Sequence, residues 1–518
     1  MTARRQNLWA ALVGLIAAAA TLALAEVAAL LIAPAASPLL AVGSLVIDLV
    51  PAWLKNLVIG LFGTDDKIVL LITLGLLVAA LAAGVGILEY RRPPFGIVGL
   101  VLVGGIATFA VITRADASTI WAVPTVMGMV LGVVVLRVAV DRLHRWAAAS
   151  NDGVAEFADS SVSRRGFLVM AGATAAASVV AGVAARAMNA GTTAVNAVRE
   201  ALRLPAPAIA APPIPVGAEL DIEGIAPLVS SNKDFYRIDT ALQVPVINAD
   251  DWKLRITGMV ENEIEIGFDE LLALPLVETY VTLMCVSNEV GGYLTGNAKW
   301  LGYPIRDLLA RAKPTRGADV VLSTSQDGFT ATTPLEVLQD TERNSLLAVG
   351  MNGEALPLEH GYPVRMVVPG LYGYVSATKW VVELKVSTFE KESAYWTDRG
   401  WSAKGPVKTS SRIDVPSFGD EIEPGTTVAI AGVAWAQHVG IERVEVRIDT
   451  EPWQEATLAE AISADTWRQW FIEWTATSGD HTIEVRATDA TGFTQTEKRV
   501  DVIPDGAEGW HTIQVRVP

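Results

Sequence analysis

The side chain with the clearest chemical potential is Cys285, the only cysteine among 518 residues. A lone cysteine cannot form an internal disulfide, and by itself it cannot hold an iron–sulfur cluster or a c-type haem. Two interpretations remain open: an inert buried thiol, or a thiolate that binds a soft metal or acts as a nucleophile. The apolar run Tyr280–Met284 predicts a strand that delivers Cys285 to the polar, glycine-rich loop Ser287–Gly292. Because reactive side chains gather where strands enter such loops, the context favours the thiolate.

A second informative stretch, residues 351–370, reads MNGEALPLEHGYPVRMVVPG. It predicts a hairpin-like turn, a loop bounded by glycine and proline, and a buried strand. With the cysteine stretch it resembles the sulfite oxidase family of molybdenum enzymes, whose pattern M-N-G-x-x-L-P-x-x-H-G-x-P-x-R-x-x-V-P-G it matches in full. The resemblance runs from about Phe235 to the C-terminus.

The resemblance implies an oxidoreductase with Mo-molybdopterin as its cofactor and Cys285 as both metal ligand and catalytic residue. His360 and Arg365 would reach the pterin and its phosphate, and Lys379 lies in the next cofactor-binding turn. Binding of a phosphate by two cations and backbone amides is physically reasonable. The cofactor-binding residues expected in this way are Arg237, Asn288, Asp327, His360, Arg365, Ser376, Thr378 and Lys379.

Two of these positions keep an alternative explanation. Arg237 presents a planar donor fork that suits phosphate or pterin acceptors, but a surface ion pair would also account for it. Asp327 precedes Gly328 and is explained equally well as an exposed turn residue.

Three departures from the family pattern bear on the substrate. Val290, preceded by Glu289, stands where sulfite oxidases carry an arginine, and Val349 stands where they carry a tyrosine. The final substrate arginine has no counterpart in residues 505–510, DGAEGW. An anion such as sulfite needs cationic neighbours, so a neutral oxygen donor or acceptor such as a sulfoxide is easier to accommodate.

The elements that must position the site fall into four regions. Residues 1–200 predict an all-α transmembrane anchor, and residues 201–233 a proline-rich linker that acts as an extended spacer. Residues 234–407 are expected to form an α+β molybdopterin-binding domain of the sulfite oxidase type. Residues 408–518 predict an immunoglobulin-like β-sandwich, which dimerises in that family, so a homodimer is expected.

Local patterns place several elements within the last two regions. In the molybdopterin region Asn297–Gly302 matches the family's pattern of a small-residue loop followed by a tryptophan and a glycine. The strands and helices expected there are Trp252–Val260, Phe268–Leu274, Ile305–Ala312 and Val320–Ser325. The strands expected in the sandwich are Thr427–Trp435, Ile441–Asp449, Arg468–Trp474, Thr482–Thr488, Glu497–Val502 and Trp510–Val517.

Five apolar runs have roughly the 20-residue length that crosses a bilayer. They are Leu8–Ala33, Ile68–Leu88, Phe95–Ile112, Thr119–Val140 and Gly166–Ala187. A sixth, Pro38–Phe62, contains polar residues and is expected to be interfacial or re-entrant on the outer side. Arginines at Arg4 and Arg5 place the N-terminus inside.

Before the last run, Ser163–Leu168 resembles a twin-arginine export signal, although two ordinary inside-flanking arginines are the alternative. Both interpretations place the C-terminal two-thirds of the chain outside the cell membrane, and the upstream apolar runs favour a retained multi-pass anchor.

Charge and histidine content exclude two functions. Residues 1–200 carry a net charge of +3 and the remainder −19, which argues against nucleic-acid binding. Only His144 lies near a predicted span, so the membrane part cannot hold a bis-histidine haem, and electrons require a separate transfer partner. The leading hypothesis is a membrane-anchored oxidoreductase that transfers an oxygen atom to or from a small molecule. A membrane-tethered scaffold that keeps the fold is the main alternative, and a cysteine hydrolase lacks a convincing histidine partner.

Overall fold

The structure, a computed structural model, divides the described chain into two compact units. The first contains the described residues before 150 together with residues 240–244, and the second contains 195–239 and 245–518. The described residues are 2–32, 36–51, 54, 58, 61, 66–114, 117–149, 195–417 and 420–518.

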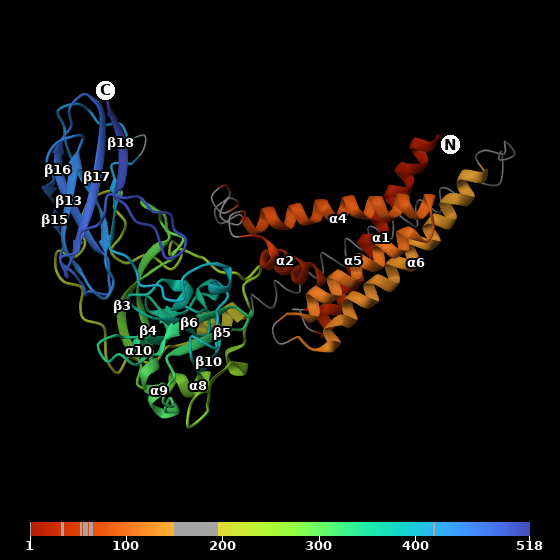
Figure 1. The fold of residues 1–518 in the computed structure, drawn as a ribbon, viewed down its shortest axis with the longest axis horizontal. Helices are drawn as coiled ribbons and strands as arrows, with labels where there is room; N and C mark the ends of the chain where they lie inside the picture. Colours follow the sequence, from red (N-terminus) through yellow and green to blue (C-terminus); the bar gives the residue numbers. More distant parts are fainter. Residues whose placement is uncertain are drawn as a thin grey trace. The chain divides into compact units, whose positions relative to one another are not determined.

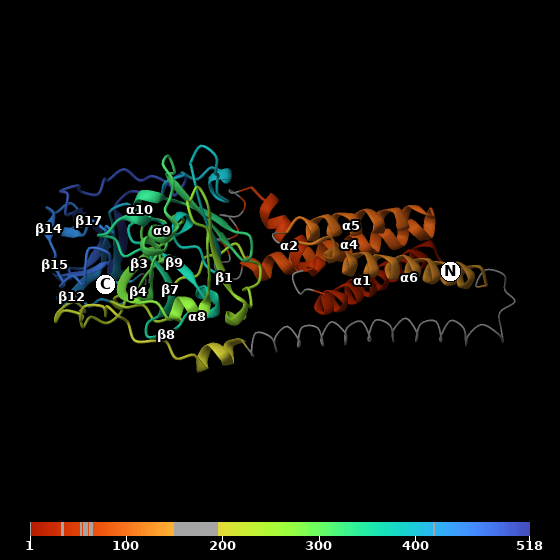
Figure 2. The same cartoon turned by 90° about the horizontal axis from the view of Figure 1, so that it is seen from below.

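The first unit is a bundle of helices (Figures 1 and 2). Four of the described helices are long and apolar enough to cross a membrane. Its helices are α1 (Ala3–Ile32), α2 (Pro38–Leu49), α4 (Asp66–Arg91), α5 (Phe95–Ile112) and α6 (Ala122–Ala149). The apolar run expected at Gly166–Ala187 and the twin-arginine segment before it lie outside the described residues. Most of the second half of the run Pro38–Phe62 also lies outside them.

Glycines allow the backbones of α1 and α4 to approach closely. A Cβ added at Gly14 of α1 would lie 1.9 Å from the Ala82 carbonyl oxygen, and one at Gly86 of α4 would lie 2.1 Å from the Ala10 carbonyl oxygen. Small residues at such crossings permit van der Waals contact between helices in lipid, where the hydrophobic effect gives no driving force.

We expect the Gly86→Leu substitution to separate α1 from α4 and to destabilise the unit by about 1–3 kcal/mol through overpacking. The measurement is thermal denaturation of the full chain in detergent. Gly84→Leu is the matched control, because a Cβ at Gly84 of the same helix meets nothing within 4 Å. Equal denaturation temperatures for the two variants would contradict the close crossing.

The first part of the second unit is an α+β region that contains two β-sheets and short helices. One sheet has the order β3-β4-β7-β8, with β9 also paired to β7, and the other has the order β2-β1-β10-β5-β6. The strands of the first sheet are β3 (Val277–Met284), β4 (Thr295–Pro304), β7 (Leu346–Met351), β8 (Glu354–Ala355) and β9 (Arg365–Val367). The strands of the second are β1 (Lys253–Gly258), β2 (Ile264–Gly267), β5 (Val320–Ser325), β6 (Thr330–Pro334) and β10 (Val381–Ser387). The helices are α8 (Phe268–Leu272), α9 (Ile305–Ala312) and α10 (Leu335–Gln339).

The local predictions for α9 and β5 agree with the structure, whereas the loop expected at Asn297–Gly302 is wrong. These residues belong to β4, which pairs with β3 on one side and β7 on the other. Nearly every residue of β4 is buried, so the strand shows no alternation of polar and apolar residues from which it could be recognised.

The proline-rich stretch after residue 202 is extended and lies along the edge of β3. The Ala208 N–H donates to the Leu276 carbonyl at 2.8 Å, and the Glu278 N–H donates to the Ile209 carbonyl at 2.8 Å. The stretch therefore extends the first sheet by a short parallel bridge.

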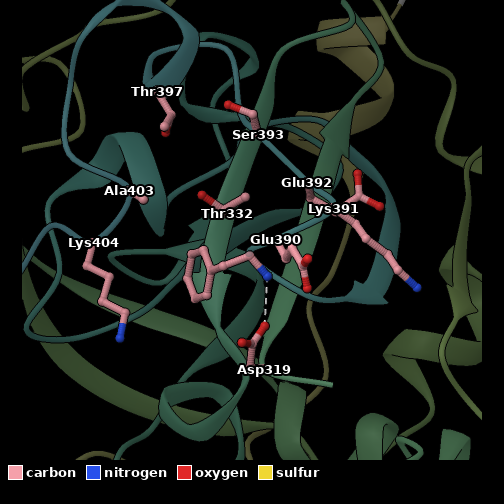
Figure 3. Close-up of a pocket in the computed structure, with 10 residues that line it drawn as sticks. Asp319, Thr332, Glu390, Lys391, Glu392, Ser393, Thr397, Ala403 and Lys404 are labelled. Carbon is pink, nitrogen blue, oxygen red and sulfur yellow. Dashed lines mark hydrogen bonds between the residues drawn. The ribbon is translucent and has the colours of Figure 1, made fainter. Parts of the chain in front are cut away.

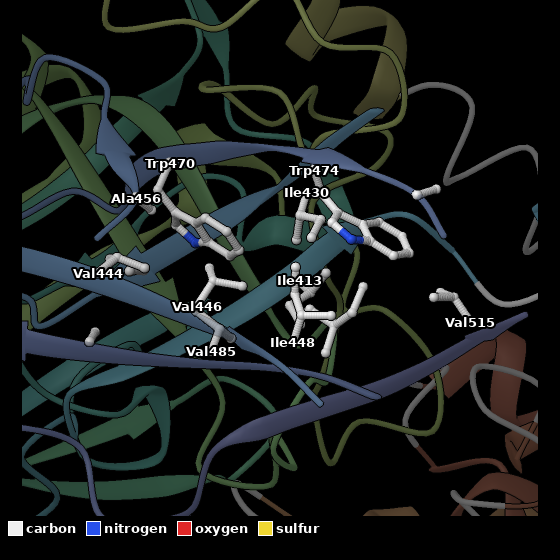
Figure 4. Close-up of a cluster of buried hydrophobic side chains, with 14 of the residues drawn as sticks. Ile413, Ile430, Val444, Val446, Ile448, Ala456, Trp470, Trp474, Val485 and Val515 are labelled. Atoms are coloured by element: carbon white, nitrogen blue, oxygen red, sulfur yellow. The ribbon is translucent and has the colours of Figure 1, made fainter. Parts of the chain in front are cut away.

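The C-terminal residues form a sandwich of two four-stranded sheets. The first has the order β11-β12-β16-β15 and the second β14-β13-β17-β18. The interior is filled by Trp470, Trp474 and aliphatic side chains from both sheets (Figure 4). The strands are β11 (Ser410–Val415), β12 (Thr427–Trp435), β13 (Ile441–Ile448), β14 (Gln454–Glu455), β15 (Thr457–Leu458), β16 (Arg468–Thr475), β17 (Gly479–Asp489) and β18 (His511–Val517).

The strand expected at Glu497–Val502 is wrong. Only Val500 is paired there, in an isolated bridge with Glu508. The segment EKRVDV has just two apolar residues, and Pro504 follows it without an N–H to donate, so a ladder cannot extend. Strand β11, which the sequence patterns did not predict, takes part in the sandwich instead.

Candidate functional site

Cys285 lies directly after β3 and is 9% exposed. Its N–H donates to the Leu294 carbonyl at 2.9 Å, which closes the loop that follows. Burial raises the pKa of the Cys285 thiol, while hydrogen bonds from the backbone and side chain of Ser287 act in the opposite direction. The sulfur is thus held in a site where its ionised form requires further stabilisation.

Asn288 shapes the cysteine loop, which we define as residues 285–294. Its Oδ1 accepts from the Leu294 N–H at 2.7 Å, and its own N–H donates to the Cys285 carbonyl at 3.1 Å. Gly292 packs against the same side chain, because a Cβ there would lie 2.6 Å from Asn288 Oδ1. The buried oxygen of Asn288 therefore serves the loop itself.

Arg365 is a buried cation in β9. It donates to the His360 carbonyl at 3.1 Å, and its guanidinium carbon lies 5.0 Å from the centre of the Trp300 ring. Burial lowers the pKa of Arg365 to about 10, so the side chain stays charged near neutral pH.

His360 lies in the short 3₁₀ turn before β9 and is 3% exposed. Its Nε2 is 2.8 Å from the Asn232 carbonyl, so this nitrogen carries the proton and donates. Burial and the nearby charges of Arg365 and Lys379 lower the pKa of His360 to about 4. The imidazole is therefore neutral near neutral pH.

Lys379 and Arg237 share one carboxylate, that of Asp239. Oδ2 of Asp239 lies 2.9 Å from Lys379 Nζ and 3.0 Å from Arg237 Nε. Burial is the main cause that lowers the pKa of Lys379 to about 8, and both arginines nearby act in the same direction. The ion pair considered as an alternative for Arg237 is present.

The other predicted residues, Ser376, Thr378 and Asp327, make hydrogen bonds within the protein. The Ser376 hydroxyl donates to the Tyr372 carbonyl at 2.9 Å, and the Thr378 hydroxyl lies 2.7 Å from the Ser323 hydroxyl. Asp327 is exposed in the turn between β5 and β6 and accepts from the Phe329 N–H at 3.4 Å. Its contacts are those of a turn residue.

Tyr236 feels the charges of both Cys285 and Arg365, and it was not singled out in the sequence. Burial raises its pKa, and the neighbouring Cys285 raises it further, whereas Arg365 acts in the opposite direction. Its hydroxyl lies near Gly373, where an added Cβ would be in van der Waals contact with that oxygen at 3.7 Å and with the Met284 carbonyl oxygen at 3.6 Å. The only signal for Tyr236 was its position directly before Arg237, in the stretch Phe235-Tyr236-Arg237 where the resemblance to the family begins.

These features fit a molybdopterin. The buried cations Arg365 and Lys379 suit an anionic phosphate, and the single thiol of Cys285 suits a soft metal. Among the described residues no group of three or more His, Cys, Asp and Glu side chains could hold a metal ion. A metal that brings most of its ligands with its cofactor needs only one protein sulfur.

A cavity of about 620 Å³ lies elsewhere in the second unit (Figure 3). Asp319 accepts there from the Phe389 N–H at 2.8 Å. No residue of the predicted site lines this cavity, so we assign it no part in the chemistry. Its lining residues are Asp319, Thr332, Phe389, Glu390, Lys391, Glu392, Ser393, Thr397, Ala403 and Lys404.

Comparison with known proteins agrees with a molybdopterin-binding domain followed by an immunoglobulin-like domain. Residues 241–396 match the family model of the oxidoreductase molybdopterin binding domain, and residues 410–485 match that of a bacterial Ig domain. Mitochondrial sulfite oxidase of Macaca fascicularis is 29% identical over 293 residues, which cover 47% of this chain and 53% of that protein. Nitrate reductase [NADH] 2 of Nicotiana tabacum is 31% identical over 178 residues, covering 29% of this chain and 20% of that protein.

Among solved structures, the sulfane dehydrogenase SoxCD from Paracoccus pantotrophus shares the fold. The TM-score is 0.51 at 24% identity, and the match covers 56% of this chain and 82% of that chain. The chain spans about half the length of the mitochondrial sulfite oxidases that it matches.

Fold and matches together define a molybdopterin-dependent oxidoreductase with Mo-molybdopterin as its cofactor. Within this class the chain is similar to sulfite oxidases and nitrate reductases over its molybdopterin-binding region, and it also has N-terminal apolar helices and a C-terminal immunoglobulin-like domain. The fold class, enzyme class and cofactor expected from the sequence are confirmed, whereas the roles of the individual site residues stay predictions.

The low pKa of His360 predicts a stability that falls with acid. The unfolded chain takes up a proton near pH 6.5 and the folded chain only near pH 4, so stability is lost as the pH falls through this window. The free energy of unfolding should therefore fall between neutral and acid pH, and we expect His360→Gln to remove up to about 3 kcal/mol of this fall.

The measurement is thermal denaturation of the cofactor-free full chain in detergent at about pH 7.5 and about pH 4.5. His481→Gln is the control with the opposite sign: Asp449 raises the pKa of His481, so this histidine stabilises the fold at low pH and the stabilisation is lost as the pH rises. An acid sensitivity unchanged by His360→Gln would contradict a buried neutral imidazole.

Proposed function

We propose that this protein is a membrane-anchored, outward-facing oxidoreductase that transfers an oxygen atom to or from a small neutral molecule. The observation that carries the proposal is that the lone thiol and a buried cation both act on one phenol: Cys285 raises the pKa of Tyr236, and Arg365 lowers it. A metal ligand and a cofactor-phosphate cation would be arranged in this way around one molybdopterin.

Each of the chain's own groups has a part in this proposal. Cys285 ligates the metal as a thiolate, and Ser287 hydrogen bonds stabilise the sulfur's negative charge. Arg365 and Lys379 bind the cofactor's phosphate and pterin, and neutral His360 orients Arg365 through its carbonyl. When bound, the molybdenum cofactor supplies a two-electron redox centre that exchanges an oxygen atom with the substrate.

The charges near Cys285 support a neutral substrate. Lys408 lies beside Tyr372, whose raised pKa reflects burial and also the proximity of Cys285. The Lys408 ammonium is paired with Asp505 at 2.9 Å and with Glu508 at 2.8 Å. Its positive charge is therefore already neutralised, and an anion would gain little from it.

Other residues support the same conclusion. Val349 is fully buried, and Val290 is half-buried in the cysteine loop beside exposed Glu289. The relatives are named for sulfite, nitrate and sulfane as substrates, but the positions that sulfite oxidases use for a cationic pocket are apolar or acidic here. A sulfoxide-like substrate fits these positions better than sulfite.

Two features support the proposed location and electron route. The apolar helices and the arginines at the predicted inner ends of the spans favour a multi-pass anchor with the catalytic domain outside the cell membrane. The sequence offers no ligands for a haem or cluster, so a separate protein is proposed to carry the electrons.

The test is metal content and turnover of the full chain produced in a host that makes the cofactor. We expect about one molybdenum per chain, and we expect Cys285→Ser to reduce turnover by at least about 100-fold because the metal loses its protein ligand. A scaffold would lack molybdenum and would keep partner binding after this substitution. Wild-type protein without stoichiometric molybdenum would overturn the proposal.

The substrate class is tested with a dye electron donor for sulfoxides and a dye acceptor for sulfite. We expect kcat/KM for a neutral sulfoxide to exceed that for sulfite by at least about tenfold. Val290→Arg should reduce the ratio of the two kcat/KM values, because it adds a cation to the cysteine loop. Gln454→Arg on exposed β14 adds the same charge elsewhere and should leave the ratio unchanged. Preferred turnover of sulfite by the wild type would contradict the neutral-substrate assignment.

A further inference from the structure

The C-terminal sandwich holds the cysteine loop directly through Arg412 of β11. This arginine is 2% exposed, and its Nη1 donates to the Gly292 carbonyl at 3.0 Å. Its Nε donates to Asp414 Oδ1 at 2.6 Å, and the guanidinium carbon lies 4.7 Å from the centre of the Tyr293 ring. The carboxylate thus fixes the arginine while the arginine fixes the loop.

His511, the first residue of β18, makes the second contact. Its Nδ1 accepts from the Ile413 N–H at 2.9 Å, which leaves Nε2 protonated and turned toward the loop. A Cβ at Gly291 would lie 2.3 Å from Nε2, so the imidazole sits flush against the glycine backbone. Gly291 also has a φ of +81°, which a side chain would strain.

The neutral form of His511 preserves this contact near neutral pH. Burial and the Arg412 charge lower its pKa to about 4, and Arg499 acts in the same direction, whereas Asp414 opposes them. The ring therefore packs as an uncharged group.

The residues held in this way connect to Cys285 within the loop. Gly292 packs on Asn288 Oδ1, and Asn288 closes the loop with Leu294 at 2.7 Å. Leu294 in turn accepts from the Cys285 N–H at 2.9 Å. A displacement at Gly291 or Gly292 therefore reaches the backbone that carries the sulfur.

We propose that Arg412 and His511 are positioning residues that hold the Cys285 sulfur in place for metal binding. The sandwich is then part of the catalytic apparatus in addition to any role in dimerisation. This inference rests on the proposed function, because it gives Cys285 the part of the metal ligand, but the mechanical link can be tested without metal.

Cys285 is the only cysteine in the sequence, so thiol alkylation reports on this loop alone. The experiment uses the full chain in detergent, produced in a host that lacks the cofactor, and measures the rate of reaction with iodoacetamide. The variants are Arg412→Ala, Arg412→Lys and His511→Gln, and Cys285→Ser gives the background.

Arg447→Ala is the matched control. Arg447 is also a sandwich arginine with a carboxylate partner, Glu484 at 2.6 Å, and an aromatic partner, Trp453 at 4.7 Å, and both of these partners lie within the sandwich. It tests whether the loss of any such arginine exposes the thiol.

We expect Arg412→Ala to react about tenfold faster than the wild type, because the loop loses a charge-assisted hydrogen bond and opens more often. His511→Gln keeps an acceptor for Ile413 but removes the ring from Gly291, so we expect an increase of about threefold. Arg412→Lys keeps the charge but cannot reach both Asp414 and Gly292, so its rate should lie between those of the wild type and Arg412→Ala.

Equal rates for these variants and Arg447→Ala, with thermal transitions retained, would overturn the inference. If Arg412→Ala does not fold, Arg412→Lys and His511→Gln decide the question in the same way. A wild type that binds no molybdenum but shows the expected labelling pattern would refute the proposed function and leave the link between sandwich and loop supported.

Discussion

The central constraint of the proposed site is a thiol that is buried and that would have to be ionised to bind a metal. Burial of Cys285 raises its pKa, and the Ser287 hydrogen bonds offset only part of that effect. A metal ion at the sulfur would stabilise the thiolate directly, since a coordinating thiol is deprotonated. The site therefore makes physical sense with a cation present and is unfavourable for a free thiolate.

The same balance applies on the cofactor side. Arg365 and Lys379 are buried, burial lowers the pKa of both, and Asp239 is the carboxylate that pairs with Lys379. A bound phosphate would supply the missing negative charge. The thiolate would need a positive charge beside it, and the buried cations would need a negative charge. One anionic cofactor that carries a metal would supply both.

Local signals in the sequence accounted for much of the fold. The run MNGEALPLEHGYPVRMVVPG carried the resemblance to the sulfite oxidase family, and helix α9 and strands β5 and β12 follow an amphipathic pattern or short apolar runs that need no tertiary information. Strand β4 was not predicted, because burial on both faces removes the alternation. The strand expected at Glu497–Val502 failed for the opposite reason, since two apolar residues gave an alternation that no partner strand uses.

The site was predictable only where its residues lie inside motifs. Cys285, His360 and Arg365 could be named from the sequence, but the contacts of Arg412 and His511 with the cysteine loop join residues about 120 and 220 positions apart. Nothing in the local sequence marks such a pair. Asp239 likewise gained significance only when the structure placed it between Lys379 and Arg237.

The most direct test of the account is the molybdenum X-ray absorption spectrum of the loaded full chain, compared between wild type and Cys285→Ser. The account predicts that the substitution removes one sulfur neighbour from the metal while the sulfur neighbours supplied by the cofactor remain. An unchanged number of sulfur neighbours would show that Cys285 does not bind the metal and would contradict the account.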